Sequence, residues 1–199
     1  MEFLPVLDSL DTPKERIWYS LLPKGSAPGV SVGHTCTYHS SENKDKGKIL
    51  IVGGANPSGS FSHTYIINLD KYEWDIPDWE GLDARYEHCS FHTESCPHTL
   101  WLFGGAKQSG NLQSIQNIQL NEHKPSWKTV SVNGKPPSPR TYHTSSACLG
   151  DRLFVFSGGE AGTMPVSDSQ LYVFDTVSLH GHNQKLGVPL HLLDTATLL

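Results

Sequence analysis

The sequence lacks any long uninterrupted run of apolar residues, and no stretch approaches the roughly 20 that a membrane-spanning helix requires. Residues 1–8 carry no positive charge and end in an aspartate, so they do not resemble a secretory signal. Charge is also scarce: only 18% of residues are Asp, Glu, Lys or Arg, the net charge is -5, and the one basic run, 44–48, is interrupted by Asp45 and Gly47. Because a phosphate backbone attracts a concentrated positive surface, nucleic acid is not expected as a partner.

Cysteines are few and scattered. No Cys-x-x-Cys spacing occurs among the four, which are Cys36, Cys89, Cys96 and Cys148. A candidate glycan acceptor, the Asn-x-Ser triplet at residues 56–58, has a proline in its middle position and cannot accept a glycan. These absences favour a reducing, cytosolic setting. In contrast, 18 glycines and 13 prolines among 199 residues are typical of many short strands joined by turns, so the fold class expected is all-β.

One four-part phrase occurs three times. An Arg or Ser stands three residues before a His, an apolar run then leads into Gly-Gly, and a further strand is followed by a lone Trp. The histidines are His34, His88 and His143, the glycine pairs Gly53-Gly54, Gly104-Gly105 and Gly158-Gly159, and the tryptophans Trp18, Trp74 and Trp127. The histidines are 54 and 55 residues apart, the glycine pairs 51 and 54, and the tryptophans 56 and 53. This spacing is close to the kelch period of about 50, in which each unit folds as one four-stranded propeller blade.

The phrase divides the chain into blades. Residues 32–74 and 85–127 form two complete units, whereas 140–175 form a third unit that is incomplete because no Trp follows Phe174. Before them lie an N-terminal lead, 1–16, and an orphan outermost strand, 17–21; after them, 176–199 is an unmatched tail. Natural rings hold about four to eight blades, so we expect a partial propeller of about three blades in an incomplete ring. In each complete blade, the Trp ring is expected to fill the space beside a neighbouring blade.

Short segments within the repeats resemble a known protein family in sequence. The segments 51–57, 85–88, 103–106, 108–111, 137–141 and 143–146 resemble kelch-repeat propellers, and more closely those that act as effectors of Rab GTPases. The resemblance covers roughly residues 14–176 and ends after Ser178. It implies a cytoplasmic protein without a cofactor that recognises a GTP-bound Rab of late endosomes. Such a protein supports vesicle return to the trans-Golgi network and associates peripherally with endosome and trans-Golgi membranes through its partners.

The candidate partner site lies on loops, where propellers carry their function. Arg85 and Arg140 each precede a repeat histidine by three residues, on the face that surrounds the central funnel, and a guanidinium group suits acidic partner segments. Asn56, Phe61, Gln108 and Asn111 follow the glycine pairs and belong to the same face. The alternative is structural: each arginine packs against a neighbouring blade or caps a loop carbonyl, and Phe61 belongs to a core.

Other chemistries have less support. The repeat histidines occupy equivalent positions in different blades and are expected to serve the repeat, while His180 and His182 lack a third ligand nearby. No glycine pair leads into Gly-Lys-Ser/Thr, and no nucleophile stands on a strand-turn-helix elbow. We therefore expect an interaction scaffold and not an enzyme, with a metal-dependent enzyme on a kelch propeller, or a non-functional truncated product, as the alternatives.

An incomplete ring also raises a question of assembly. Three blades leave apolar blade faces in water, which favours aggregation or instability. A second solution is a two-fold homodimer in which each chain donates the Trp18 strand to the third blade of the other, giving six blades.

Overall fold

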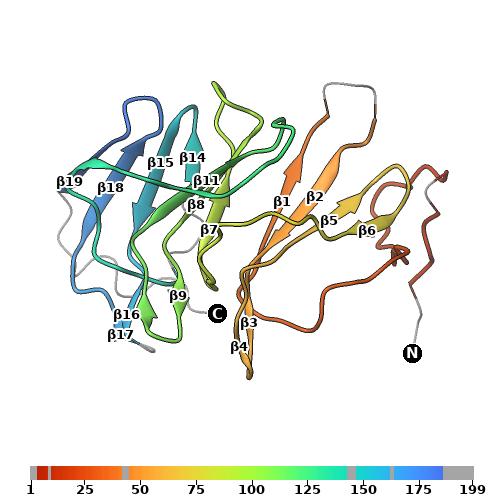
Figure 1. The fold of residues 1–199 in the computed structure, drawn as a ribbon, viewed down its shortest axis with the longest axis horizontal. Helices are drawn as coiled ribbons and strands as arrows, with labels where there is room; N and C mark the ends of the chain where they lie inside the picture. Colours follow the sequence, from red (N-terminus) through yellow and green to blue (C-terminus); the bar gives the residue numbers. More distant parts are fainter. Residues whose placement is uncertain (1–3, 9, 42–44, 143–146, 162–163, 186–199) are drawn as a thin grey trace.

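The computed structural model describes residues 4–8, 10–41, 45–142, 147–161 and 164–185, and these contain strands and turns but no helix (Figure 1). The all-β prediction is confirmed. Three large sheets stand side by side, each with four antiparallel strands arranged in chain order, and none of them closes into a ring. The described part of the chain is therefore a row of three propeller blades.

Blades 1 and 2 have four strands each, ordered from the innermost to the outermost in chain order. Blade 1 consists of β1 (Thr35–His39), β2 (Lys48–Val52), β5 (Thr64–Asn68) and β6 (Glu73–Asp75). Blade 2 consists of β7 (Cys89–Phe91), β8 (Thr99–Phe103), β11 (Ile115–Gln119) and β12 (Lys128–Val130).

Blade 3 corrects the boundary expected at residue 175. It contains β14 (Ala147–Leu149), β15 (Arg152–Phe156), β18 (Gln170–Asp175) and a fourth strand, β19 (His180–Lys185), which the sequence had assigned to the unmatched tail. β19 pairs along the whole of β18, because the outer N–H and C=O groups of β18 need partners and the backbone supplies them whatever the side chains are.

Three small hairpins extend from one end of the blades, shown at the bottom of Figure 1. They are β3–β4 (Ala55–Asn56 and Gly59–Ser60), β9–β10 (Ala106–Lys107 and Gly110–Asn111) and β16–β17 (Gly159–Ala161 and Met164–Pro165). Each begins directly after the turn that ends the second strand of its blade, so equivalent loops of successive blades gather on the same face.

Strand β8 is the centre of the core. All five of its residues are buried, because blade 2 lies between two other blades, as the unbroken apolar run 100–103 predicts. Successive side chains of a strand point to opposite faces, and the two cores divide accordingly. Leu100 and Leu102 pack with Leu50 of blade 1 and Trp127, whereas Trp101 and Phe103 pack with residues of blade 3. The expected place of Trp127 beside a neighbouring blade is confirmed.

A further repeat of glycines, which the motif above does not include, lies where the chain approaches each blade along its outermost strand. Gly25, Gly81 and Gly134 lie seven residues after the three tryptophans and have φ of +90°, +89° and +89°. Each belongs to a strap, which we define as the two residues, 24–25, 80–81 or 133–134, that run along the outermost strand of the blade that follows. The backbone N–H of Trp74 donates to Lys24 O at 2.7 Å and that of Trp127 to Glu80 O at 2.9 Å.

The third strap is long enough to count as a strand, β13 (Asn133–Gly134), parallel to β19. Within it, Gly134 faces Gly181 just as Gly25 faces Trp74 and Gly81 faces Trp127. The straps cover outermost edges that would otherwise expose unpaired backbone groups.

Two further expectations need correction. Residues 17–21 form no strand: among the described residues their pairing is a single bridge between Ser20 and Val6, and Trp18 is 82% exposed. The third glycine pair is displaced by one residue, because Ser157, with φ of +58°, occupies the place of Gly53 and Gly104, which have φ of +64° and +66°. The equivalent pair in blade 3 is therefore Ser157-Gly158.

The strand-exchanged dimer loses its basis because β19 completes blade 3. Its premise was a vacant outermost position in blade 3, and β19 occupies that position within the same chain. The Trp18 segment would have to displace β19 in order to pair there.

We predict that Gly81→Ala destabilises the fold. A Cβ at Gly81 would lie 2.5 Å from the carbonyl oxygen of Trp127 in a left-handed backbone conformation, so we expect a loss of more than about 1 kcal/mol in the free energy of unfolding by urea. Gly29→Ala is the matched control, since nothing lies within 4 Å of its Cβ position. Equal urea midpoints for the two variants would contradict the role of the strap.

Candidate functional site

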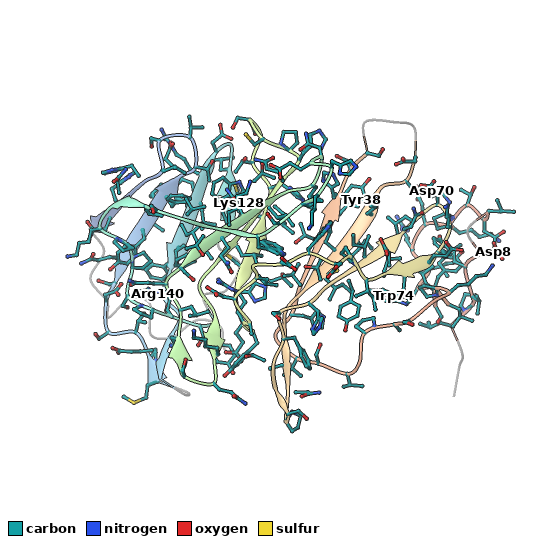
Figure 2. The ribbon with its side chains drawn as sticks, viewed as in Figure 1. Asp8, Tyr38, Asp70, Trp74, Lys128 and Arg140 are labelled. Atoms are coloured by element: carbon teal, nitrogen blue, oxygen red, sulfur yellow. The ribbon has the colours of Figure 1, made fainter. Side chains whose placement is uncertain are left out.

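The two repeat arginines are completely buried, which decides between their two interpretations. Arg85 donates from Nε to Asp83 O at 3.2 Å, from Nη1 to Gly104 O at 3.1 Å, and from Nη2 to Gln116 Oε1 at 2.7 Å. Arg140, which lies among the strands of blade 3 (Figure 2), repeats this pattern. It donates to Ser138 O at 3.1 Å, to Ser157 O at 3.0 Å, and to Asp168 Oδ2 at 2.8 Å.

Each arginine joins two blades. The N–H of Arg85 donates to Phe61 O at 3.1 Å, and its carbonyl accepts from Gly54 N at 2.8 Å, so its backbone is bound to blade 1 while its side chain enters blade 2. Arg140 does the same one blade later, through Leu112 O and Gly105 N. In the first unit the equivalent residue is Ser31, whose Oγ pairs with His34 Nδ1 at 3.3 Å.

The two buried guanidinium groups each have a carboxylate nearby, but at different distances. Asp83 Oδ2 lies 3.6 Å from Arg85, and Asp168 Oδ2 lies 2.8 Å from Arg140. Burial lowers the pKa of Arg85 to about 10, opposed by Asp83, so the guanidinium remains charged at neutral pH. Since both guanidinium groups are consumed by internal acceptors and have no access to solvent, the prediction that they bind a partner is corrected to a structural role.

The repeat histidines differ in their burial. His88 is buried, and its Nε2 lies 3.1 Å from Thr35 Oγ1 of the preceding blade, which supports the expected structural role at this position. His34, by contrast, is exposed, and His143 lies outside the described residues. The third site of the repeat therefore stays a prediction.

The other four candidates lie on the hairpin face, which we define as the end of the molecule that carries β3–β4, β9–β10 and β16–β17. Asn56 Oδ1 accepts the N–H of Ser58 at 2.8 Å and shapes the first hairpin. Asn111 Nδ2 donates to Gly159 O and Glu160 O at 3.1 and 2.7 Å, so it ties the second hairpin to the third. Gln108 is exposed, and Phe61 is half-buried with its ring 6.4 Å from that of His63.

A groove on the hairpin face was missed by the sequence analysis. Val30 and Val32 are exposed, at 92% and 67%, on the segment that leads into blade 1. They line the groove together with Ala55, Asn56, Pro57 and Tyr86. Two exposed valines on either side of a serine are a visible signal, but in the sequence alone the alternation also suits the start of a strand.

The opposite end carries a cluster of three histidines at the junction of blades 1 and 2. The ring of His39 lies 5.2 Å from that of His92 and 5.4 Å from that of His98. Burial, followed by the charges of His92, His98 and Lys48, lowers the pKa of His39 from 6.5 to about 4. Burial likewise lowers the pKa of His92, although its hydrogen bond to Thr99 opposes this.

Two absences apply to the described ranges alone. No group of three or more His, Cys, Asp or Glu side chains in them is arranged to hold a metal ion. In the same ranges no helix has the length and apolar character needed to cross a membrane. The four cysteines are all described, and none of them forms a disulfide bond.

Four-stranded antiparallel blades, the glycine turn after each second strand and the repeat histidines and arginines define a kelch-repeat propeller. Residues 33–188 match the family model described as "KLHDC2/KLHL20/DRC7 Kelch-repeats domain", and the chain belongs to this kelch-repeat family.

Within the family, the chain is similar to proteins named "Rab9 effector protein with kelch motifs". It is 58% identical to the one from Danio rerio over 188 residues, which cover 90% of this chain and 54% of that protein. The identities are 53% for the Xenopus laevis protein and 47% for that of Homo sapiens, again over 90% of this chain and over 49% and 48% of those proteins. The chain thus spans about half the length of these relatives.

Removing a buried arginine should be costly. We expect Arg85→Ala to lower the free energy of unfolding by about 3 kcal/mol or more, because it leaves buried carbonyl and amide acceptors without a donor. The control is Arg152→Ala, since Arg152 forms an exposed pair with Asp175 worth at most about 1 kcal/mol. Chemical denaturation followed by circular dichroism measures both, and similar losses would show that the inter-blade arginine is dispensable.

The histidine cluster should make stability depend on pH. Because the pKa of His39 is lowered on folding, the unfolded chain binds more protons than the folded one between about pH 6.5 and 4. The free energy of unfolding should therefore fall as the pH drops through this window, and His39→Asn should reduce that slope in urea titrations at pH 7, 6 and 5. His123→Asn, which changes an exposed histidine outside the cluster, is the matched control. An unaltered slope in the His39 variant would refute the assignment.

Proposed function

We propose that this chain is a protein-interaction scaffold, and not an enzyme, that binds a Rab GTPase in its GTP-bound state. The observation that carries the proposal is the identity of 47 to 58% with Rab9 effector proteins, which extends over 90% of the chain. A match that extends over 90% of the chain includes its loops as well as its strands, and this supports a binding surface carried by these blades.

The hairpin face is the proposed docking surface. Equivalent loops of three blades meet there, and it presents exposed apolar side chains beside polar ones, a composition that suits protein interfaces. Val30, Val32 and Gln108 supply side chains accessible to a partner, while Asn56 and Asn111 hold the hairpins in place. Phe61 contributes the exposed part of its ring.

The cellular role that follows is transport between membranes. A chain that binds a GTP-bound Rab of late endosomes would be recruited from the cytoplasm to endosome and trans-Golgi membranes through that partner. There it would support the return of vesicles from endosomes to the trans-Golgi network.

A pull-down with purified Rab9 tests the proposal. The chain should be retained by Rab9 locked in the GTP state and at least tenfold less by the GDP form, and Val30→Asp should weaken the retention by placing a charge in the groove. Leu10→Asp is the matched control, because Leu10 and Val30 are exposed to 93% and 92%.

Two other outcomes can be distinguished from the expected one. No retention of the parent chain in either nucleotide state would overturn the proposed function for this chain. Retention that is equal for the parent and both variants would keep the Rab partner but exclude the groove as the contact surface.

A further inference from the structure

The third blade lacks the tryptophan of the other two, and the pairing of the strands identifies what replaces it. In blade 1, Trp74 pairs with Ile67 of β5, and its carbonyl lies against Gly25 of the strap. In blade 3, Gly181 pairs with Phe174 of β18, and its carbonyl lies against Gly134 of the strap. Gly181 therefore stands at the tryptophan position.

Trp127 shows what a tryptophan does at this position when another blade is next to it. Its side chain is 4% exposed and packs between blades 1 and 2 with Leu50, Leu100 and Ile118. No hydrogen-bond partner for its Nε1 is found among the described residues. The space between two blades can thus hold a flat bicyclic ring by apolar packing alone.

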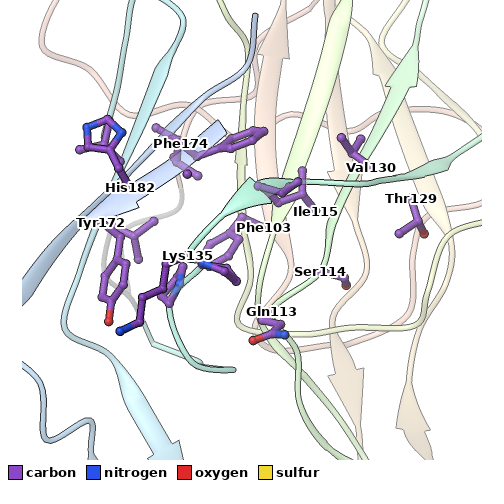
Figure 3. Close-up of a pocket in the computed structure, with 17 residues that line it drawn as sticks. Phe103, Gln113, Ser114, Ile115, Thr129, Val130, Lys135, Tyr172, Phe174 and His182 are labelled. Atoms are coloured by element: carbon purple, nitrogen blue, oxygen red, sulfur yellow. The ribbon is translucent and has the colours of Figure 1, made fainter. Parts of the chain in front are cut away.

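Between blades 2 and 3 the corresponding space is a cavity of about 290 Å³ (Figure 3). Its walls are mainly apolar, with Ser114 and Thr129 also among the lining residues, and they come from both blades, while Gly181 contributes no side chain. The main wall residues are Phe103, Ile115, Val130, Leu153, Val155 and Phe174. For comparison, an engineered apolar cavity of about 150 Å³ in another protein stays dry and binds benzene.

The rim of the cavity is polar. Gln113, Lys135 and the hydroxyl end of Tyr172 lie along one side of it in Figure 3, and His182 lies on another. An aromatic guest with a single N–H or O–H group can therefore bury its ring against the apolar walls and turn its polar edge towards these groups or towards water.

We propose that the cavity between blades 2 and 3 is a binding site for a small neutral aromatic molecule of indole size, opened by Gly181 at the position where the other blades carry tryptophan. The site is separate from the hairpin face, so it does not depend on the proposed Rab interaction.

Indole itself is the probe. Titrated into the full chain, it should raise the melting temperature in proportion to occupancy, and it should shift the side-chain NMR signals of Phe103 and Tyr172, which line the cavity. Absence of a shift in both measurements at millimolar indole would overturn the proposal without any variant.

Filling the cavity from within should have the opposite consequence for binding. A Cβ at Gly181 has room, because the nearest atom, Cγ1 of Val132, lies 3.7 Å away. Gly181→Trp should raise the melting temperature by about 3 °C or more and weaken indole binding at least tenfold. A folded Gly181→Trp protein that binds indole as the parent does would exclude this cavity as the site.

Two glycine variants serve as matched controls. Trp127→Gly should open an equivalent cavity between blades 1 and 2, lower the melting temperature, and regain part of the loss when indole is added. Trp74→Gly should gain no indole site, because Trp74 is half-buried and belongs to neither apolar cluster. Rescue of both variants to the same extent would mean that indole acts through non-specific binding.

Discussion

No blade of this protein can bury both of its faces alone, and this constraint governs the rest of the structure. A four-stranded sheet presents two rows of side chains, and water covers any row that no neighbour covers. Only blade 2 has a neighbour on each side, and its strand β8 is accordingly buried throughout. The two apolar clusters are therefore properties of pairs of blades, and stability is shared between neighbours as it is in other repeat proteins.

Polar contacts impose the same dependence on neighbours. Arg85 and Arg140 each hold the backbone of the preceding blade through their own N–H and C=O groups while their guanidinium groups satisfy carbonyls within the next blade. The hydrophobic effect that drives apolar packing has no preferred direction. Because hydrogen bonds to a rigid guanidinium group have a defined direction, they fix one blade's position relative to the next.

The sequence predicts the parts of this fold that depend on local patterns. The apolar run ending at Phe103 and the glycines after it locate a buried strand and its turn without any knowledge of neighbours. A structural role for Arg85 was one of two interpretations that the sequence left open, and the sequence could not identify the acceptors, because Gly104 and Gln116 lie 19 and 31 residues further along the chain. Strand β19 escaped detection because its sequence, HGHNQK, has no apolar alternation and is specified by the edge of β18. The strap glycines could have been found, since they share the spacing of the tryptophans.

The straps determine which stretch of chain contains everything that a finished blade needs. Each strap lies before its blade in the sequence and covers that blade's last strand, so the segments that close on themselves are 24–75, 80–130 and 133–185. A duplication or recombination event that copied a blade from its repeat arginine onward would leave the strap behind and produce a copy with a bare outer strand. A copy that begins at the residue before the strap glycine would instead contain a finished blade with its outer strand covered.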